Sequence, residues 1–185
     1  MTIRLDTLDI GSGDHPNGTV NLDLLIEEDL PFKKGSKHYP ARRLLAIPNF
    51  VKADAQCLPF KNKCFSKTFC YHVLEHIDRE DRALAEMDRV TDGTVEIRVP
   101  YARFEDVINT LFFWKHLKAW RRKYHLRRYT KMSLDRSLKK YFRQEQITLS
   151  YGYIGLFQSL RFKSVRNRFP PLPFPWEIVA VIKTG

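Results

Sequence analysis

Two glycines and two aspartates in the first third of the chain could form part of a nucleotide site. The first apolar run ends in Gly11, Ser12 and Gly13. Because glycine has no Cβ, such a turn can bend sharply and bring its backbone close to a ligand. Asp23 ends the next apolar run and Asp54 ends the third. Each of these residues alone has a simpler explanation as a turn or a strand end, but together they indicate a nucleotide-binding unit.

The stretch YHVLEHI, residues 71–77, contains groups that can transfer protons. His72 follows an apolar run directly and is our candidate for a general base or an orienting contact. We expect Glu75 and His76 on the short helix that follows. His72 and His76 also have the HxxxH spacing of helical metal ligands, but the sequence shows no third ligand, so we expect no metal. A structural role in the protein interior is the alternative for all three residues.

The connection between the first two apolar runs is unusually short. A parallel crossover normally needs about a dozen residues, including its helix, and only residues 12–19 are available here. We therefore predict an extended or single-turn crossover in which the usual helix is deleted. Backbone amides of residues 11–15 must then replace a helix N-terminus as the anion-binding group, and the pocket becomes more open.

The rest of the first half alternates strands with helical connections, which favours a parallel sheet with helices on its faces. Asp78 is the expected N-cap of a helix over residues 79–90, which Asp92 and Gly93 end. The expected strands are residues 7–10, 20–24, 48–54, 67–71 and 94–100.

The second half changes character. Residues 103–143 carry 13 basic and 3 acidic residues, whereas residues 1–102 carry 14 basic and 16 acidic ones. We expect residues 103–129 to be largely helical, followed by a helix capped by Ser133. Two strands over residues 147–154 and 177–183 are predicted to flank a long loop, residues 157–175, for whose proline-rich part, residues 169–175, we have no explanation.

Composition limits the class of protein. A chain of 185 residues with 43% hydrophobic residues can form one domain with its own core. No apolar run approaches the roughly 18 residues of a membrane span, and the N-terminus lacks a signal-peptide pattern. Three cysteines without CxxC spacing indicate reduced thiols. We therefore expect a cytoplasmic protein.

Several segments, in this order, resemble the class I S-adenosylmethionine-dependent methyltransferases, and among them the small type-11-like family. The segments are LDIGSG (8–13), NLDL (21–24), ADAQCLPF (53–60), CFSKTFCYHVLEHI (64–77), ALAEMDRV (83–90) and VEIRVP (95–100). They span slightly over half of the chain. The resemblance implies a single α/β domain over residues 1–185 with a Rossmann-like, seven-stranded, mostly parallel sheet and an antiparallel last strand. Residues 103–143 then form a basic, aromatic helical insertion after the fifth strand.

The resemblance also implies S-adenosyl-L-methionine as cofactor and assigns residues to it. Asp9 and the glycine turn hold its methionine end, Asp23 its ribose, and Asp54 its adenine. Leu24 and Ala55 lie beside these two acids, and His72 lies where the reactive methyl group emerges. The expected substrate-binding residues are Glu75, His76, Trp114, Arg121 and Arg122.

The composition of residues 103–143 indicates an anionic acceptor. Aromatic side chains interleaved with cations can stack on bases and neutralise phosphates, as in RNA binding. A membrane surface is an alternative, because residues 107–117 carry an apolar stripe, and so is ordinary packing of the aromatic residues on the sheet. We also consider a catalytically weak or inactive methyltransferase-fold module that binds RNA, membrane or a protein partner through its basic face. An activating protein partner that completes the open pocket is compatible with both an active enzyme and an inactive binding module. The oligomeric state stays open.

Overall fold

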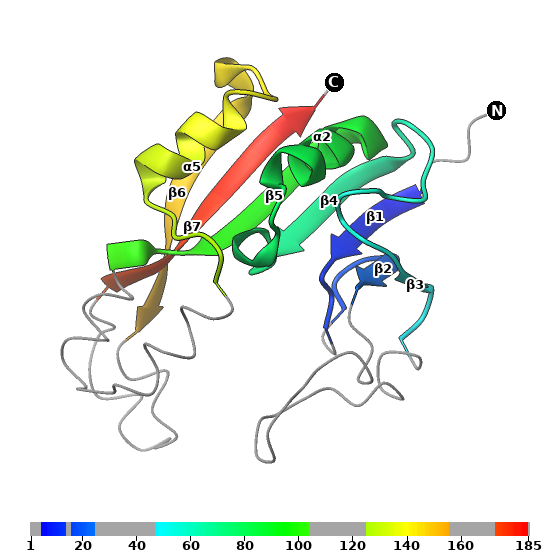
Figure 1. Ribbon diagram of the computed structural model, residues 1–185, viewed down its shortest axis with the longest axis horizontal. Helices are drawn as coiled ribbons and strands as arrows, with labels where there is room; N and C mark the ends of the chain where they lie inside the picture. The colour runs from blue at the N-terminus through cyan, green and yellow to red at the C-terminus, as the bar shows by residue number, and fades with distance from the viewer. Residues whose placement is uncertain (1–4, 14–15, 25–46, 104–124, 156–172, 185) are drawn as a thin grey trace, which may run out of the picture.

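A single twisted sheet organises the molecule (Figure 1). The computed structural model describes residues 5–13, 16–24, 47–103, 125–155 and 173–184. Its strands are β1 (Leu5–Ile10), β2 (Val20–Asp23), β3 (Phe50–Lys52), β4 (Phe65–Tyr71), β5 (Thr91–Pro100), β6 (Ile147–Gly155) and β7 (Pro173–Thr184). They lie in the order β3-β2-β1-β4-β5-β7-β6.

The sheet is mixed, as predicted. The pairs β1–β2, β2–β3, β1–β4 and β4–β5 are parallel, and β7 runs antiparallel to both β5 and β6. The chain order reverses between β1 and β4, because β2 and β3 extend the sheet to one side and β4 and β5 to the other. In open α/β sheets, ligands bind at the carboxyl ends of the strands at such a reversal. The predicted nucleotide residues therefore lie at the edge where a ligand is expected.

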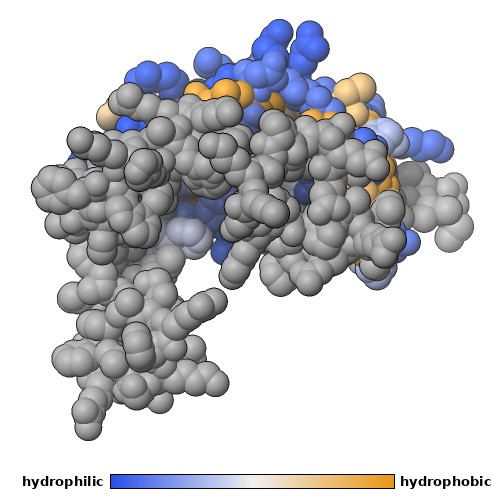
Figure 2. Space-filling model, turned by 60° about the horizontal axis from the view of Figure 1, so that its bottom comes forward, coloured by the Kyte–Doolittle hydropathy of each residue, from blue (hydrophilic) through white to orange (hydrophobic). Residues whose placement is uncertain are grey.

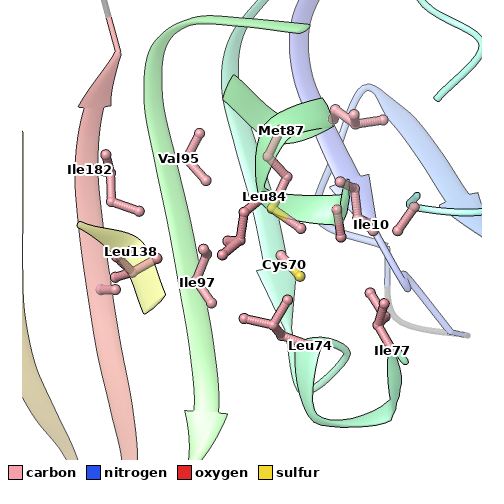
Figure 3. Close-up of a cluster of buried hydrophobic side chains, with 14 of the residues drawn as sticks. Ile10, Cys70, Leu74, Ile77, Leu84, Met87, Val95, Ile97, Leu138 and Ile182 are labelled. Carbon is pink, nitrogen blue, oxygen red and sulfur yellow. The ribbon is translucent and has the colours of Figure 1, made fainter. Parts of the chain in front are cut away.

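Two helices, α2 (Glu80–Val90) and α5 (Lys131–Leu138), lie on one face of the sheet (Figure 1). The inner face of α2 carries Ala83, Leu84, Met87 and Val90, all fully buried and spaced as one helical stripe. These side chains meet alternate residues of the central strands, such as Cys70, Val95 and Ile97, in one continuous core (Figure 3). Among the described residues, no helix is long and apolar enough to span a membrane.

The shortened crossover has the predicted form. The described parts of this connection, residues 11–13 and 16–19, contain no helix. The chain returns along β1: Thr7 and Thr19 exchange hydrogen bonds of 2.8 to 3.0 Å, and the Asn17 amide donates to Asp9 Oδ2 at 2.8 Å. A Cβ on Gly18 would lie 2.7 Å from the Asp9 backbone nitrogen. Only glycine at position 18 therefore allows the crossover segment to pass this close to β1.

Both expected boundaries of the α2 unit were wrong. The N-cap residue of α2 is Arg79, and Asp78 instead accepts a hydrogen bond from the Arg79 amide. Asp92 and Gly93 do not terminate that unit, because β5 begins at Thr91, immediately after α2.

The helix after the basic segment also starts earlier than expected. Thr130 is the N-cap of α5, and Ser133 is the third helical residue, which completes a capping box. Residues 125–130 are not helical, in contrast to the expected helix over 103–129, and residues 104–124 lie outside the described part of the chain.

The final strand extends into the region expected to be a loop. β7 begins at Pro173 and pairs Pro173 with Gly155 and Pro175 with Tyr153. The register shifts between Gly152 and Tyr153. Proline is tolerated at such an irregular strand start, where a regular ladder hydrogen bond is not required.

Candidate active site

The glycine turn wraps the carboxyl end of β1 over that of β2. The amides of Gly11 and Ser12 both donate to the Leu22 carbonyl oxygen, at 2.7 and 3.1 Å. Gly11 has a φ of +71°, which disfavours other residues, and a Cβ there would lie 2.1 Å from Val73 Cγ2. The first turn therefore packs directly against the segment that carries the predicted catalytic residues.

Asp23 and Gly13 meet across this turn. The Gly13 amide donates to Asp23 Oδ2 at 3.1 Å, so the acid at the end of β2 lies against the glycine turn, and its contact with a ribose stays a prediction. Leu24, the next residue, is half exposed beside it. Ser12 is 7% exposed, and its Oγ makes no hydrogen bond to any described residue. A buried hydroxyl without a partner is costly, and a polar ligand group could satisfy it.

Asp9 is 2% exposed and lies under the crossover. Its Oδ2 accepts hydrogen bonds from both the backbone amide and the side-chain amide of Asn17. Burial raises the pKa of the Asp9 carboxyl, an effect that the Asn17 hydrogen bonds oppose and the nearby Asp23 charge reinforces. In this structure Asp9 fixes the crossover segment at Asn17. Contact between Asp9 and the methionine end of a cofactor remains a prediction.

Asp54 begins a turn after β3. Its carboxylate accepts hydrogen bonds from the Gln56 amide at 2.9 Å and from the Gln56 side chain at 3.1 Å. Asp54 thus has the simpler role considered from the sequence, that of a turn residue. Its contact with adenine remains a prediction. Ala55 is buried, and the Leu58 amide donates to Glu86 Oε2 at 2.7 Å, which ties the turn to α2.

His72 lies at the end of β4 with a φ of +56°. Its Nε2 is 3.1 Å from Glu177 Oε2, its Nδ1 is 3.8 Å from Glu75 Oε1, and its ring stacks on Trp176 with a centroid distance of 5.2 Å. Burial lowers the pKa of His72, but the hydrogen bond to Glu177 and the charges of Glu177 and Glu75 outweigh burial and raise the pKa to about 9. The raised pKa favours the protonated ring, which donates hydrogen bonds, so this geometry supports an orienting contact better than a general base.

Glu75 and His76 lie in the single-turn helix η2 (Leu74–His76). Glu75 is 1% exposed, whereas the His76 side chain is 43% exposed. His125, from the segment before α5, joins them: one ligand atom from each of the three residues lies within 4.8 Å of the others. These three residues are potential metal ligands, but the set does not contain the His72–His76 pair singled out from the sequence.

Sequence reasoning missed Glu177, Trp176 and His125. Glu177 is a buried acid in an otherwise apolar strand, and this contrast in EIVAVI was the one available signal. Nothing local in the sequence marks Trp176 or His125, because their neighbours come from β4 and η2. The other predicted substrate residues, Trp114, Arg121 and Arg122, lie outside the described residues.

The residues at the β1–β4 reversal fit an S-adenosylmethionine cofactor. The left-handed turn at Gly11 leaves no room for a Cβ, and Ser12 offers an unsatisfied hydroxyl. The Asp23 carboxylate stands at the end of β2, where it can accept hydrogen bonds from a ribose diol. Seen from this edge, the visible described surface is largely hydrophilic, with smaller hydrophobic areas (Figure 2).

Comparison with known proteins agrees with this geometry. Residues 27–95, rather more than a third of the chain, match the family model described as a methyltransferase domain. A search of curated proteins gives no significant match. The structure is similar to a SAM-dependent methyltransferase from Archaeoglobus fulgidus, with a TM-score of 0.57, 19% identity, and 99% of this chain and 87% of that chain covered.

Two further structures share the fold. One is a Haloferax volcanii methyltransferase in complex with the activator Trm112, with a TM-score of 0.59, 11% identity, and 100% and 86% of the two chains covered. The other is the Haemonchus contortus phosphoethanolamine N-methyltransferase 2, in complex with phosphomonomethylethanolamine and S-adenosylhomocysteine. Its TM-score is 0.59 and its identity 15%, with 100% of this chain and 50% of that chain covered. Residues 27–95 thus match the methyltransferase-domain family, and the chain has the fold of the class I S-adenosylmethionine-dependent methyltransferases.

Proposed function

We propose that this protein methylates an anionic acceptor, RNA being the acceptor class that its charge pattern favours. The single observation that carries the proposal is the place of the basic segment. Residues 103–143 have a balance of 13 basic to 3 acidic residues, and the described chain on both sides of residues 104–124 is anchored at the carboxyl end of β5.

The anchoring is visible in the described residues on either side of 104–124. Tyr101, just after β5, pairs with Tyr129, and the Ala102 amide donates to the Tyr129 carbonyl oxygen at 2.8 Å. The Tyr129 hydroxyl also donates to Glu80 on α2 at 2.6 Å. The described chain therefore leaves the sheet at Ala102 and returns at Tyr129, both beyond the carboxyl end of β5, which supports a basic surface near the candidate active site.

Some of this charge is used within the protein. Arg127 lies 3.5 Å from Glu80, Lys139 pairs with Asp135 at 2.5 Å, and Arg128 donates to the Ala102 carbonyl oxygen. For these cations, a role within the protein fold is therefore supported in place of binding to an anionic acceptor. The proposal therefore depends chiefly on the cations of residues 115–123, five in number, which have no acidic residue among them.

In the proposed reaction, S-adenosylmethionine would supply the methyl group: an acceptor atom would attack the methyl carbon in line with the carbon–sulfur bond, and this bond would break as S-adenosylhomocysteine leaves as a neutral thioether. Gly11, Ser12 and Asp23 would hold the cofactor, and His72 at the end of β4 would lie beside it. Proximity and alignment can supply most of the rate in such a displacement. The acceptor atom is not part of the proposal.

Two measurements test the proposal. The first is calorimetric titration of the full chain with S-adenosylmethionine and S-adenosylhomocysteine, with Asp23→Ala as the matched variant. We expect saturable binding that is at least about tenfold weaker in the variant, because a charge-assisted hydrogen bond is lost. No binding at millimolar ligand would instead favour the inactive binding module.

The second measurement is incubation with labelled cofactor and separated RNA, lipid and protein fractions. Label in RNA supports the proposal, and label confined to lipid or protein contradicts it. RNA binding in gel shifts should weaken steeply between low and moderate salt, whereas insertion into liposomes should persist.

A protein partner is a second part of the proposal. The chain shares its fold with a methyltransferase solved with the activator Trm112, and its short crossover leaves one side of the pocket without the usual helix. An activator added to the titration should tighten cofactor binding if the pocket is completed by a partner, and should leave the affinity unchanged if it is not.

A further inference from the structure

Glu75, His76 and His125 form a group of potential metal ligands beside the end of β4. One ligand atom from each lies within 4.8 Å of the other two. The rings of His76 and His125 meet edge to face at a centroid distance of 4.9 Å. Two imidazoles and one carboxylate are the ligand types of zinc sites that keep a position open for a further ligand.

The backbone holds the two halves of this group together. The amides of Leu126 and Arg127 both donate to the Glu75 carbonyl oxygen, at 2.8 and 3.2 Å. The Arg127 side chain also donates to the Ile77 carbonyl oxygen, on the far side of η2. His125, next to Leu126, is therefore placed beside η2 by hydrogen bonds of the main chain and not by the flexibility of its own side chain.

The state of Glu75 is an independent indication of a missing ligand. The residue is 1% exposed, and its Oε2 makes no hydrogen bond to any described residue. Its Oε1 is 3.8 Å from His72 Nδ1 and 3.9 Å from His76 Nε2, both beyond hydrogen-bonding distance. A buried carboxylate oxygen without a hydrogen-bond partner is costly, and a cation bound at Oε2 would remove that cost.

We propose that Glu75, His76 and His125 bind a divalent transition-metal ion, Zn²⁺ in the first instance. Bonds of about 2.0–2.1 Å in a tetrahedral site place ligand atoms about 3.4 Å apart. The present separations of up to 4.8 Å therefore close by rotation of the two imidazoles. The exposed side of His76 gives the ion a route of entry and leaves a fourth position for water or another ligand.

The position of the metal site suggests that the ion binds the methyl acceptor, an inference that rests on the proposed function. Glu75 also lies next to His72, at the end of β4 where the acceptor is expected. A metal ion with an open position binds oxygen ligands and orients them. A phosphate or hydroxyl oxygen of the anionic acceptor is the group that this position would take.

Metal titration of the full chain tests the site without any cofactor. The protein is first stripped with a chelator and then titrated with Zn²⁺ against a chromophoric competitor, and with Co²⁺ followed by visible absorption. We expect one ion per chain and the intense visible bands of four-coordinate Co²⁺, without the near-ultraviolet band of a thiolate ligand.

The matched variants are His125→Gln and Glu75→Gln, with Cys57→Ser as control because Cys57 is an exposed thiol outside the group. Each ligand variant should weaken Zn²⁺ binding by roughly tenfold or more, and the control should bind as the original chain does. Unchanged affinity in both ligand variants, or no uptake by the original chain, would overturn the site.

Circular dichroism of each variant shows whether it is folded. If a variant unfolds, the Co²⁺ spectrum of the original chain decides, because thiolate or six-coordinate bands contradict the site. Failure of the proposed function would appear in the S-adenosylmethionine titration and leave the metal titration unaffected.

Discussion

Substitution of Gly11 by alanine tests the packing of the glycine turn against the catalytic segment. Gly11 has a φ of +71°, and an added Cβ would lie 2.1 Å from Val73 Cγ2 and 3.3 Å from Val73 Cβ. The alanine therefore faces two separate obstacles, a left-handed backbone and a steric overlap with a β-branched side chain that has little rotamer freedom.

The two costs can be assigned separately. The left-handed backbone costs about 1–2 kcal/mol for a residue with a Cβ, and displacement of Val73 from its rotamer about 1 kcal/mol more. The lower entropy of the unfolded alanine chain offsets about 0.5–1 kcal/mol. We expect Gly11→Ala to lower the free energy of unfolding by about 2 kcal/mol and to weaken S-adenosylmethionine binding, because the turn that holds the cofactor must shift.

A double-mutant cycle in urea provides the assay. Gly11→Ala, Val73→Ala and the double variant are unfolded in parallel, and cofactor affinity is measured by calorimetry. The double variant keeps the backbone strain but loses the overlap, so it should be about 1 kcal/mol more stable than additivity predicts. Additive effects, or a change below about 0.5 kcal/mol for Gly11→Ala, would refute the packing argument.

Other substitutions test Asp23, at the end of β2, and Glu86, which holds the turn after β3. Asp23→Asn should weaken S-adenosylmethionine binding by roughly 10- to 100-fold, because a charge-assisted hydrogen bond is lost. Calorimetry should show the weaker binding, and the urea unfolding midpoint should change little. Equal affinities of the variant and the original chain would exclude Asp23 from the cofactor site. Glu86 hydrogen-bonds Arg89 and the Leu58 amide, and the Arg89 hydrogen bond holds the Glu86 pKa below its ordinary value of 4.5, against burial, which raises it. The stabilisation from Glu86 is therefore present above pH 4.5 and is lost as pH falls through the lower, folded-state pKa. Glu86→Gln should cost about 1 kcal/mol at neutral pH and flatten the acid limb of a stability–pH curve measured in urea, and an unchanged limb would contradict this assignment.

The local parts of the site could be predicted from the sequence. Gly11, Gly13 and Asp23 are recognisable because each follows an apolar run that becomes a strand, and the parallel sheet brings the carboxyl ends of those strands to one edge. The missing helix of the first crossover was predicted from the length of the connection alone, since residues 12–19 cannot hold a full crossover helix. The start of α5 was misplaced because Thr130 and Ser133 are both good capping residues, and only the hydrogen-bond geometry shows that Thr130 is the cap.

The sequence by itself determined the order of strands along the chain, the glycine turn, the acid at the end of β2 and the concentration of positive charge after β5. These features depend on residue type, spacing and chain length, which are local properties. The tertiary structure alone decided that His72 lies against Glu177 and Trp176, and that His125 meets Glu75 and His76. Such contacts join side chains from β4, β7, η2 and the segment before α5, and their geometry follows from the packing of the whole sheet, which no local pattern of residues encodes.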